Sequence, residues 1–418
     1  MSDQTTLASI LDDRRRLETF LQRDPTNLKA HELMEKLRSF LLPDPELNQE
    51  LKRLELSEKA LVLLSVPEFL EIESTTRCNI NPPCIMCHTR MFRSSDRDID
   101  AAVLEKIKKY TRYAKTVSLH GGGEPLMVPN LFDTVEHIDP LKTMVIFSSN
   151  GLLLTENRCA EIIDRGVGYV NFSLDAANPE TYDKIRHSDF ISVINNLKRL
   201  ASIKKARGSR LPKFCLSMVI MKENIEETVE FVELAHDVGA DYVEFMKLGS
   251  LPEAQYYRTT YKDFVFDYRG QMLENIPEAH NQWMHKAYRR AKELGLTFRY
   301  EGWLNDKESM YLSNIPQEVQ ESGGCEVEKP RTLSILCEKP WTGAFVLMNG
   351  NVIPCCNLPA QVLGNLKDQG FDEVWNGQRA QEIRAVMLED PLPEICRDCH
   401  VYKARRLDPS VHSERERI

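Results

Sequence analysis

The sequence predicts an α/β fold built around a mostly parallel sheet, with a helical segment before it and a small cysteine-rich region after it. Over residues 67–248, short apolar runs rich in β-branched residues alternate with helical patterns, which is typical of βαβ units. From residue 325 onward the composition shifts towards cysteine, proline and turn residues. We therefore expect three parts, residues 1–66, 67–322 and 323–418.

The composition is that of an ordinary soluble globular protein of 418 residues, with 42% hydrophobic and 28% charged residues. A formal net charge of −9 argues against a nucleic-acid-binding surface as the main function. The first residues lack the basic start and apolar core of a signal peptide, and apolar runs such as Ala60–Leu64 are too short to span a membrane. We expect a cytoplasmic protein, with no nucleic-acid or membrane partner. The oligomeric state stays open.

Residues 1–66 have a helical pattern interrupted by prolines, which predicts two or three helices. This segment carries no catalytic constellation, so we favour a helical cap on the main domain over a docking element. The central region is expected to form six strands followed by a later helix and strand. The expected strands are 68–74, 116–120, 144–147, 169–173, 214–220, 242–245 and 297–300; the expected helices are 101–113, 129–138, 155–165, 191–206, 226–238 and 281–294. Right-handed crossovers give either a full or partial barrel or an open doubly wound sheet.

Eleven cysteines in a chain without secretion signals indicate metal or redox ligands in preference to disulfides. Three of them, Cys78, Cys84 and Cys87, form a C-x5-C-x2-C loop directly after the first expected strand. Three thiolates suit an iron–sulfur cluster whose fourth iron stays open. Zinc is the competitor, but structural zinc sites usually close with four ligands. Cys159 and Cys215 are expected to pack as small apolar residues.

This loop resembles the cluster motif of radical S-adenosylmethionine (SAM) enzymes, whose common spacing is C-x3-C-x2-C. Here the first gap is two residues longer, and Met86 replaces the usual aromatic residue. About thirty residues on, Gly122, Gly123 and Glu124 resemble the GGE motif of the same family. The resemblance implies that their backbone contacts the amino group of SAM. A tight turn is the other interpretation of this glycine-rich stretch.

The third expected strand ends at Ser149-Asn150-Gly151, which is similar to the family's TNG turn. The resemblance implies that Ser149 and Asn150 line the cofactor site. Asn-Gly is also a general turn signal, so plain turn chemistry remains an alternative.

The fourth expected strand ends in Ser173-Leu-Asp175, and Arg186 follows in a helical pattern. The stretch resembles the family's SLD…Y..IR segment, which implies that Ser173, Asp175 and Arg186 bind the cofactor. Arginine suits a bidentate bridge to the SAM carboxylate. The alternative for Arg186 is a surface helix residue paired with Asp183.

Two charged residues near the expected barrel mouth, Lys247 and Glu301, are candidates for catalytic contact with substrate polar groups. For each residue, the alternative is a solvent-exposed surface charge without a catalytic role.

The carboxy-terminal region resembles the SPASM or twitch extension of radical SAM enzymes, which carries auxiliary iron–sulfur clusters. Its features are a G-x4-C stretch, an LGN…W segment and a closing C-x2-C. We expect one [4Fe-4S] cluster held by Cys337, Cys355, Cys396 and Cys399. Whether Cys325 or Cys356 is a further ligand stays open, and a four-cysteine zinc site is the rival.

Taken together, the resemblance implies a partial (β/α)6 TIM-type barrel that binds SAM and a [4Fe-4S] cluster, plus an auxiliary [4Fe-4S] cluster. Such enzymes cleave SAM reductively and use the 5′-deoxyadenosyl radical to abstract hydrogen from an unactivated C–H bond. The electron would come from a donor such as flavodoxin or ferredoxin. The auxiliary cluster is expected to accept the substrate's electron, hold the substrate or relay electrons.

The substrate expected from the resemblance is a small carbohydrate- or aminocyclitol-like molecule, because a single auxiliary cluster resembles the family's aminocyclitol alcohol dehydrogenases. Peptide-modifying relatives, in addition, often begin with a strand-containing recognition domain that residues 1–66 lack. Modification of a peptide or protein is the alternative. A non-catalytic zinc-binding scaffold is a weaker one.

Overall fold

The computed structural model describes residues 16–41 without 18, 45–87, 98–249 without 120, 256–300, 337–355, 361–388 and Cys396. Within these ranges, ten strands form one sheet in the order β12-β11-β10-β1-β2-β3-β4-β5-β6-β9, and β7 and β8 form a separate hairpin. The seven barrel strands run parallel. They are β1 (Phe69–Ile72), β2 (Thr116–Ser118), β3 (Met144–Ser149), β4 (Tyr169–Ser173), β5 (Lys213–Ile220), β6 (Tyr242–Lys247) and β9 (Thr297–Tyr300).

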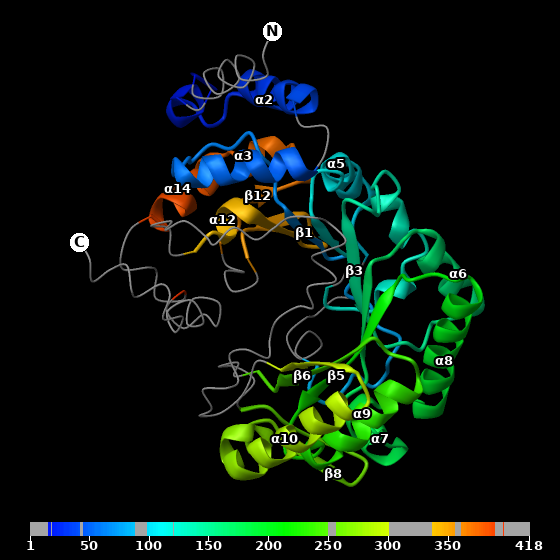
Figure 1. The fold of residues 1–418 in the computed structure, drawn as a ribbon. Helices are drawn as coiled ribbons and strands as arrows, with labels where there is room; N and C mark the ends of the chain where they lie inside the picture. The colour runs from blue at the N-terminus through cyan, green and yellow to red at the C-terminus, as the bar shows by residue number, and fades with distance from the viewer. Residues whose placement is uncertain are drawn as a thin grey trace, which may run out of the picture.

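The carboxy-terminal strands extend the same sheet beyond β1. They are β10 (Gly343–Val346), β11 (Asn351–Ile353) and β12 (Gly364–Asn365). β10 pairs with β1 in parallel, and β11 and β12 follow in antiparallel order. Helices lie on the convex side of the curved sheet (Figure 1). They are α5 (Ala101–Thr111), α6 (Glu156–Asp164), α7 (Pro179–Arg186), α8 (Phe190–Ala206), α9 (Thr228–Asp237) and α10 (Pro277–Glu293). This arrangement confirms the predicted partial barrel.

Local sequence explains where these helices begin. Asp100, Thr155 and Asp189 each cap a helix by accepting a hydrogen bond from a backbone N–H of its first turn. One predicted helix, 129–138, is wrong in type, because the structure has only a 3₁₀ segment, η2 (Leu131–Val135), there. Pro140 limits the segment at its carboxyl end, because proline disfavours the α conformation in the preceding residue, Asp139.

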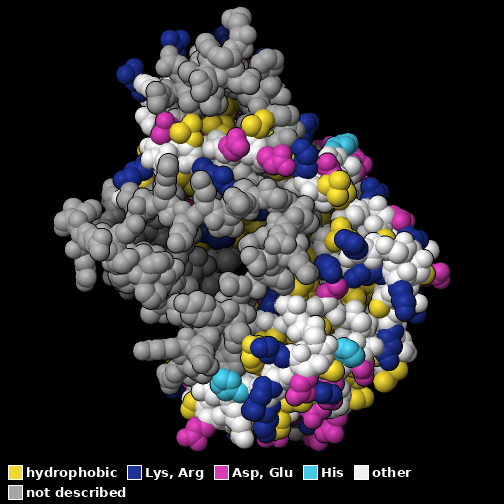
Figure 2. Space-filling model, in the orientation of Figure 1, with side chains coloured by type: hydrophobic (Ala, Val, Ile, Leu, Met, Phe, Trp, Pro, Cys, Tyr) yellow, Lys and Arg dark blue, Asp and Glu magenta, His cyan; other side chains and the backbone are white. Residues whose placement is uncertain are grey.

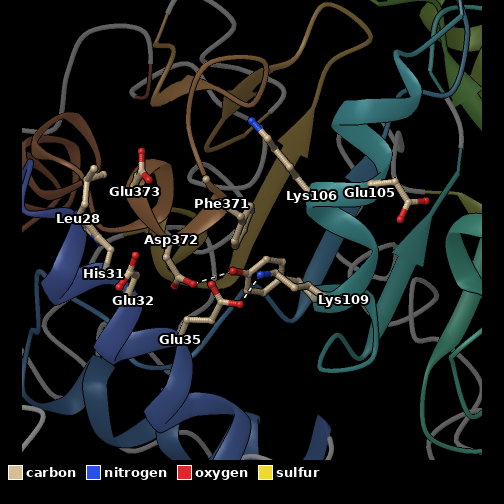
Figure 3. Close-up of a pocket in the computed structure, with 12 residues that line it drawn as sticks. Leu28, His31, Glu32, Glu35, Glu105, Lys106, Lys109, Phe371, Asp372 and Glu373 are labelled. Atoms are coloured by element: carbon tan, nitrogen blue, oxygen red, sulfur yellow. Dashed lines mark hydrogen bonds and ion pairs between the residues drawn. The ribbon is translucent and has the colours of Figure 1, made fainter.

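The amino-terminal segment is helical in its described part. Helices α2 (Leu28–Leu41) and α3 (Pro45–Ser57) are present, and no strand lies in the described residues between 16 and 68. Helix α2 packs against α13 (Phe371–Trp375) and α5, where a cavity of about 370 Å³ opens (Figure 3). Beneath it, Arg38 Nη1 lies 2.5 Å from Asp372 Oδ1, and Tyr110 donates to Asp372 Oδ2 at 2.6 Å.

The carboxy-terminal region holds the segment that leads into β1. Trp341, on α12 (Lys339–Thr342), donates its indole N–H to the carbonyl of Ala60 at 2.7 Å. Trp375 donates to the carbonyl of Ser65 at 2.9 Å. Because buried backbone carbonyls need donors, these side chains fix the entry of the first barrel strand. In the described part of this region, α14 (Gln378–Val386) follows α13.

The two faces of the sheet differ in chemistry. Positions such as Phe147, Phe245 and Phe298 face the helical layer, with ring contacts to Phe132 and to Phe231 of α9. The strand register places the alternate positions on the opposite, inner face. These are Glu71, Ser118, Asn171, Ser217, Glu244 and Arg299, among others. The inner face of the barrel therefore carries polar and charged side chains among apolar ones such as Ile146 and Met246.

In the described residues, no helix is both long and apolar enough to cross a membrane. The visible surface of the helical layer carries basic and acidic side chains interspersed rather than gathered by sign (Figure 2).

Candidate functional site

The three cysteines of the loop lie at the mouth of the barrel, between the ends of β3 and β4. Asn150 Nδ2 is 3.8 Å from Cys78 Sγ, and Arg186 Nη1 is 3.6 Å from Cys84 Sγ. Burial raises the pKa of Cys84 to about 11, with further repulsion from Cys87 and Cys78 and an opposing pull from Arg186. Burial also raises the pKa of Cys78. The three thiols therefore share one electrostatic environment.

The loop is anchored on its outer side by a small apolar cluster. Ile85 donates its backbone N–H to the carbonyl of Ile185 at 2.9 Å, and its side chain is buried with Phe266 and Tyr268. These aromatic residues belong to or follow the hairpin of β7 (Arg258–Tyr261) and β8 (Phe264–Asp267). A cavity of about 230 Å³ separates the hairpin from Cys84 and Cys87.

Three thiols with a neighbouring guanidinium fit an iron–sulfur cluster, because thiolates are its usual ligands and a nearby cation stabilises their charge. No three His, Cys, Asp or Glu side chains in the described ranges are close enough together to hold a single metal ion.

The glycine-rich loop after β2 is held by the carboxylate of its own last residue. Glu124 is 2% exposed and accepts hydrogen bonds from the Ser149 hydroxyl at 2.8 Å and the Asn150 N–H at 2.7 Å. Its own N–H donates to the Arg77 carbonyl at 2.7 Å. A Cβ at Gly123 would lie 2.2 Å from that carbonyl, so only glycine fits. The predicted residues Gly122, Gly123, Glu124, Ser149 and Asn150 therefore lie together.

Arg186 and Asp175 form a buried pair beside the cysteine loop. Asp175 Oδ2 lies 2.5 Å from Arg186 Nη2, and its Oδ1 accepts the Val219 N–H at 2.7 Å. Burial raises the pKa of Asp175, and Arg186 opposes this. The alternative of a surface pair between Arg186 and Asp183 is wrong, since Asp183 contacts Lys262 and Tyr261 of the hairpin instead.

The substrate-side predictions lie in different places. Ser173 ends β4 on the inner face, level with Ser217. Lys247 ends β6 in register with Ile220, on the face towards the helices, and is half-buried. Burial lowers its pKa, and its charge helps to lower the pKa of His280 on α10. The structure does not bring Lys247 to the inner face with Ser173. Glu301 lies outside the described residues.

The carboxy-terminal cysteines lie where the sheet extension meets the core. Cys396 is buried in the main core, and Cys337 and Cys355 are half-buried against it. Cys399, Cys325 and Cys356 lie outside the described residues.

A row of polar side chains crosses the inner face, and only one of its four members, Ser173, was predicted from the sequence. Ser173, Ser217, Glu244 and Arg299 are in register on four adjacent strands. The guanidinium carbon of Arg299 is 4.3 Å from the Tyr242 ring centroid, and its Nη1 donates to the Tyr169 hydroxyl at 3.2 Å. The signal is present in the sequence as polar residues at every second strand position.

Comparison with known proteins identifies the two parts of the chain. Residues 72–235 match the family model of the radical SAM superfamily, and residues 337–400 match that of an iron–sulfur cluster-binding domain, the SPASM domain. The chain belongs to the radical SAM superfamily. It is an enzyme of the radical SAM type with a SPASM domain, and its cofactors are SAM, a [4Fe-4S] cluster and auxiliary iron–sulfur.

Two relatives match most of the chain. The AdoMet-dependent heme synthase of Methanosarcina barkeri is 25% identical over 352 residues, covering 82% of this chain and 91% of that protein. The tungsten-containing aldehyde ferredoxin oxidoreductase cofactor-modifying protein of Pyrococcus furiosus is 21% identical, covering 81% of this chain and 88% of that protein.

Among solved structures, SuiB of Streptococcus suis bound to the precursor peptide SuiA is similar, with a TM-score of 0.54 and 17% identity. The match covers 80% of this chain and 70% of SuiB. At this identity, the likeness shows a shared fold.

Proposed function

We propose that this enzyme cleaves SAM reductively and oxidises or rearranges a small polar molecule, of the carbohydrate or aminocyclitol kind, after hydrogen abstraction from an unactivated C–H bond. SAM and the cluster supply the radical chemistry when bound. In this proposal Cys78, Cys84 and Cys87 hold the barrel cluster. Cys337, Cys355, Cys396 and Cys399 hold one auxiliary [4Fe-4S] cluster.

The cofactor-binding part of the proposal rests on the residues gathered at the barrel mouth. The glycine-rich loop and the Ser149-Asn150 turn contact the cysteine segment through Glu124–Arg77 and Asn150–Cys78, and Ser173 ends the neighbouring strand β4. Strand ends at one edge of a parallel sheet are where such folds bind ligands. Glu124 and Asp175 use their carboxylates to hold these loops, so we assign them a positioning part. In this proposal Arg186, which contacts Cys84 and pairs with Asp175, also binds the SAM carboxylate.

The single observation that carries the substrate class is the polar inner face. Glu71 and Glu244 lie on it, and the basic residues at inner-face positions of the described barrel strands are Arg299 and Lys213. Lys213 is already paired with Asp241 at 2.9 Å. The described inner-face positions thus hold two carboxylates beside Arg299, with Lys213 engaged by Asp241, and this balance of charge favours a substrate with an ammonium group, because complementary charge selects partners.

The inner face also offers hydrogen bonds suited to hydroxyl groups. Asn171 Oδ1 is buried and has no hydrogen-bond partner within the described residues. The hydroxyls of Ser173 and Ser217 lie next to it in the register. A buried acceptor without a hydrogen bond costs free energy. A ligand that donates a hydrogen bond to Asn171 Oδ1 would therefore be favoured. Lys247 and Glu301 stay predictions as catalytic residues.

The names of the full-length relatives support a small-molecule substrate, since one is a heme synthase and the other modifies a cofactor. Peptide modification is the second candidate, because the SuiB fold binds a precursor peptide. A short precursor reading frame beside the gene would favour peptide modification.

The need for a strong one-electron donor, such as flavodoxin or ferredoxin, supports a cytoplasmic reaction.

The test uses the anaerobically reconstituted full chain with SAM and dithionite. We expect 5′-deoxyadenosine, with its formation stimulated by 2-deoxystreptamine or glucosamine more than by inositol or glucose. Deuterium from a C-deuterated stimulating compound should appear in 5′-deoxyadenosine. Glu244→Gln should reduce the preference for amines. Stimulation and deuterium transfer by a peptide alone would overturn the small-molecule proposal, and zinc without iron would overturn the enzyme mechanism.

A further inference from the structure

Glu73, directly after β1, contacts two segments that are far apart in the chain. Its Oε1 accepts the N–H of Gly122 in the glycine-rich loop at 3.2 Å. Its Oε2 accepts the N–H of Met348 in the turn between β10 and β11 at 3.1 Å. The side chain is 4% exposed, so both bonds are sheltered from water. One carboxylate thus joins the barrel loop to the SPASM region.

The backbone around Glu73 reinforces this contact. Its N–H donates to the carbonyl of Val346 at 2.9 Å, which continues the β1–β10 ladder to the strand end. A Cβ at Gly121 would lie 2.4 Å from Glu73 Cγ, so the loop packs directly against the Glu73 side chain. Buried N–H groups require acceptors, and a carboxylate forms stronger bonds to them than a neutral group does.

Each hydrogen-bond partner of Glu73 lies close in the chain to a predicted cofactor-binding residue. Gly122 lies two residues before Glu124, whose carboxylate ties the loop to the Ser149-Asn150 turn. Met348 precedes β11, and Cys355 follows that strand two residues after its end. Both sites are therefore fixed relative to the same carboxylate.

We propose that Glu73 is a positioning residue that couples the two halves of the enzyme, so that the SPASM region sets the geometry of the SAM-binding loop. The inference rests on the proposed function, in which the Gly122–Glu124 loop binds SAM. Glu73 acts through the loop and touches neither SAM nor substrate. Disturbing either of its bonds changes SAM affinity and leaves the chemical step intact.

The first experiment compares Glu73→Gln with the wild-type full chain, both anaerobically reconstituted. A glutamine side chain has one acceptor oxygen, so it cannot accept both N–H groups as the carboxylate does. We expect the KM for SAM in dithionite-driven 5′-deoxyadenosine formation to rise about tenfold, with kcat and iron content unchanged. Gly121→Ala should raise the KM likewise, by displacing the Glu73 side chain.

The matched control is Glu55→Gln. Glu55 is also fully buried and accepts backbone N–H bonds, from Leu64 at 2.7 Å and Ser65 at 3.3 Å. It lies on α3, away from the glycine-rich loop, so its loss should lower thermal stability without changing the KM for SAM. Equal KM changes in both variants would reduce Glu73 to a structural role and overturn the inference.

The coupling itself is tested with Cys355→Ser, made alone and in the Glu73→Gln background. We expect Cys355→Ser alone to raise the KM for SAM, and to add little in the double variant, because both changes break one connection. A wild-type KM in either Glu73→Gln or Cys355→Ser overturns the inference. A wild-type protein that forms no 5′-deoxyadenosine contradicts the proposed function instead, so the two failures are distinct.

Discussion

Arg186 and Asp175 form an ion pair 2.5 Å long, whose side chains are 12% and 1% exposed. The pair joins the end of α7 to the second residue after β4, Asp175, which has a left-handed backbone with φ of 64°. Arg186 also reaches Cys84, so this pair connects the sheet to the cysteine loop. The position of the loop thus depends on a buried charge that lies outside the cysteine motif.

We expect Asp175→Asn to lower the free energy of unfolding by about 3 kcal/mol, because it leaves the Arg186 charge buried without its partner. Anaerobic urea unfolding measures this loss. The matched control is Asp183→Asn, whose partner Lys262 is 59% exposed, and it should cost less than about 1 kcal/mol. Equal losses in the two variants would contradict the assignment of Asp175 as the structural partner of Arg186.

Replacing two cysteines of the loop should show which cluster these cysteines hold. We expect Cys84→Ala with Cys87→Ala to abolish 5′-deoxyadenosine formation and to reduce iron from about eight to about four per chain. The remaining iron would belong to the SPASM region. Cys159→Ala and Cys215→Ala form the control, since both residues are fully buried away from the loop. Activity retained in the double variant would refute the cluster assignment.

A third prediction concerns the network between α2, α5 and α13 (Figure 3). Asp372 accepts from Tyr110 and pairs with Arg38, whose side chain is 1% exposed. Asp372→Asn should therefore destabilise the protein by about 3 kcal/mol, because a buried guanidinium loses its counter-charge. Lys109→Ala, at the exposed Lys109–Glu35 pair of the same cavity, should cost under about 1 kcal/mol. Thermal unfolding of both variants checks this, and a similar small loss in both would refute the network's importance.

The barrel and its mouth were predictable because their signals are local. The cysteine loop, the Ser149-Asn150 turn and the Ser173–Asp175 strand end are each encoded within a few residues. Helix starts such as Asp100 and Thr155 are local as well. Parallel topology then brings these strand ends to one edge without further information.

The long-range pairings were not predictable in the same way. The register of Phe69 with Gly343 joins β1 to the SPASM region, and no spacing in the sequence encodes it. The partner of Arg186 was missed because Asp183 is its helical neighbour, whereas Asp175 reaches it only through the left-handed turn after β4. No strand was predicted over residues 258–267, where the β7–β8 hairpin lies.

The last prediction concerns Glu71, on the inner face of β1. Burial, with repulsion from Glu73, raises the pKa of its carboxyl group to about 7, and Lys339 opposes this shift. The folded state therefore holds the proton more tightly than the unfolded chain, where the pKa is about 4.5. The contribution of Glu71 to stability is fully present below pH 4.5 and is lost as the pH rises through 7, by about 3 kcal/mol in total.

Glu71→Gln removes this titration, because the amide stays neutral. We expect the free energy of unfolding of this variant, measured by anaerobic urea titration between pH 5 and pH 8, to fall less with pH than that of the wild type. At pH 8 the variant should be the more stable protein. Glu156→Gln, at the exposed start of α6, should follow the wild-type slope. Parallel pH profiles for Glu71→Gln and the wild type would show that Glu71 is ionised throughout, because a protonated buried carboxyl must add to the slope.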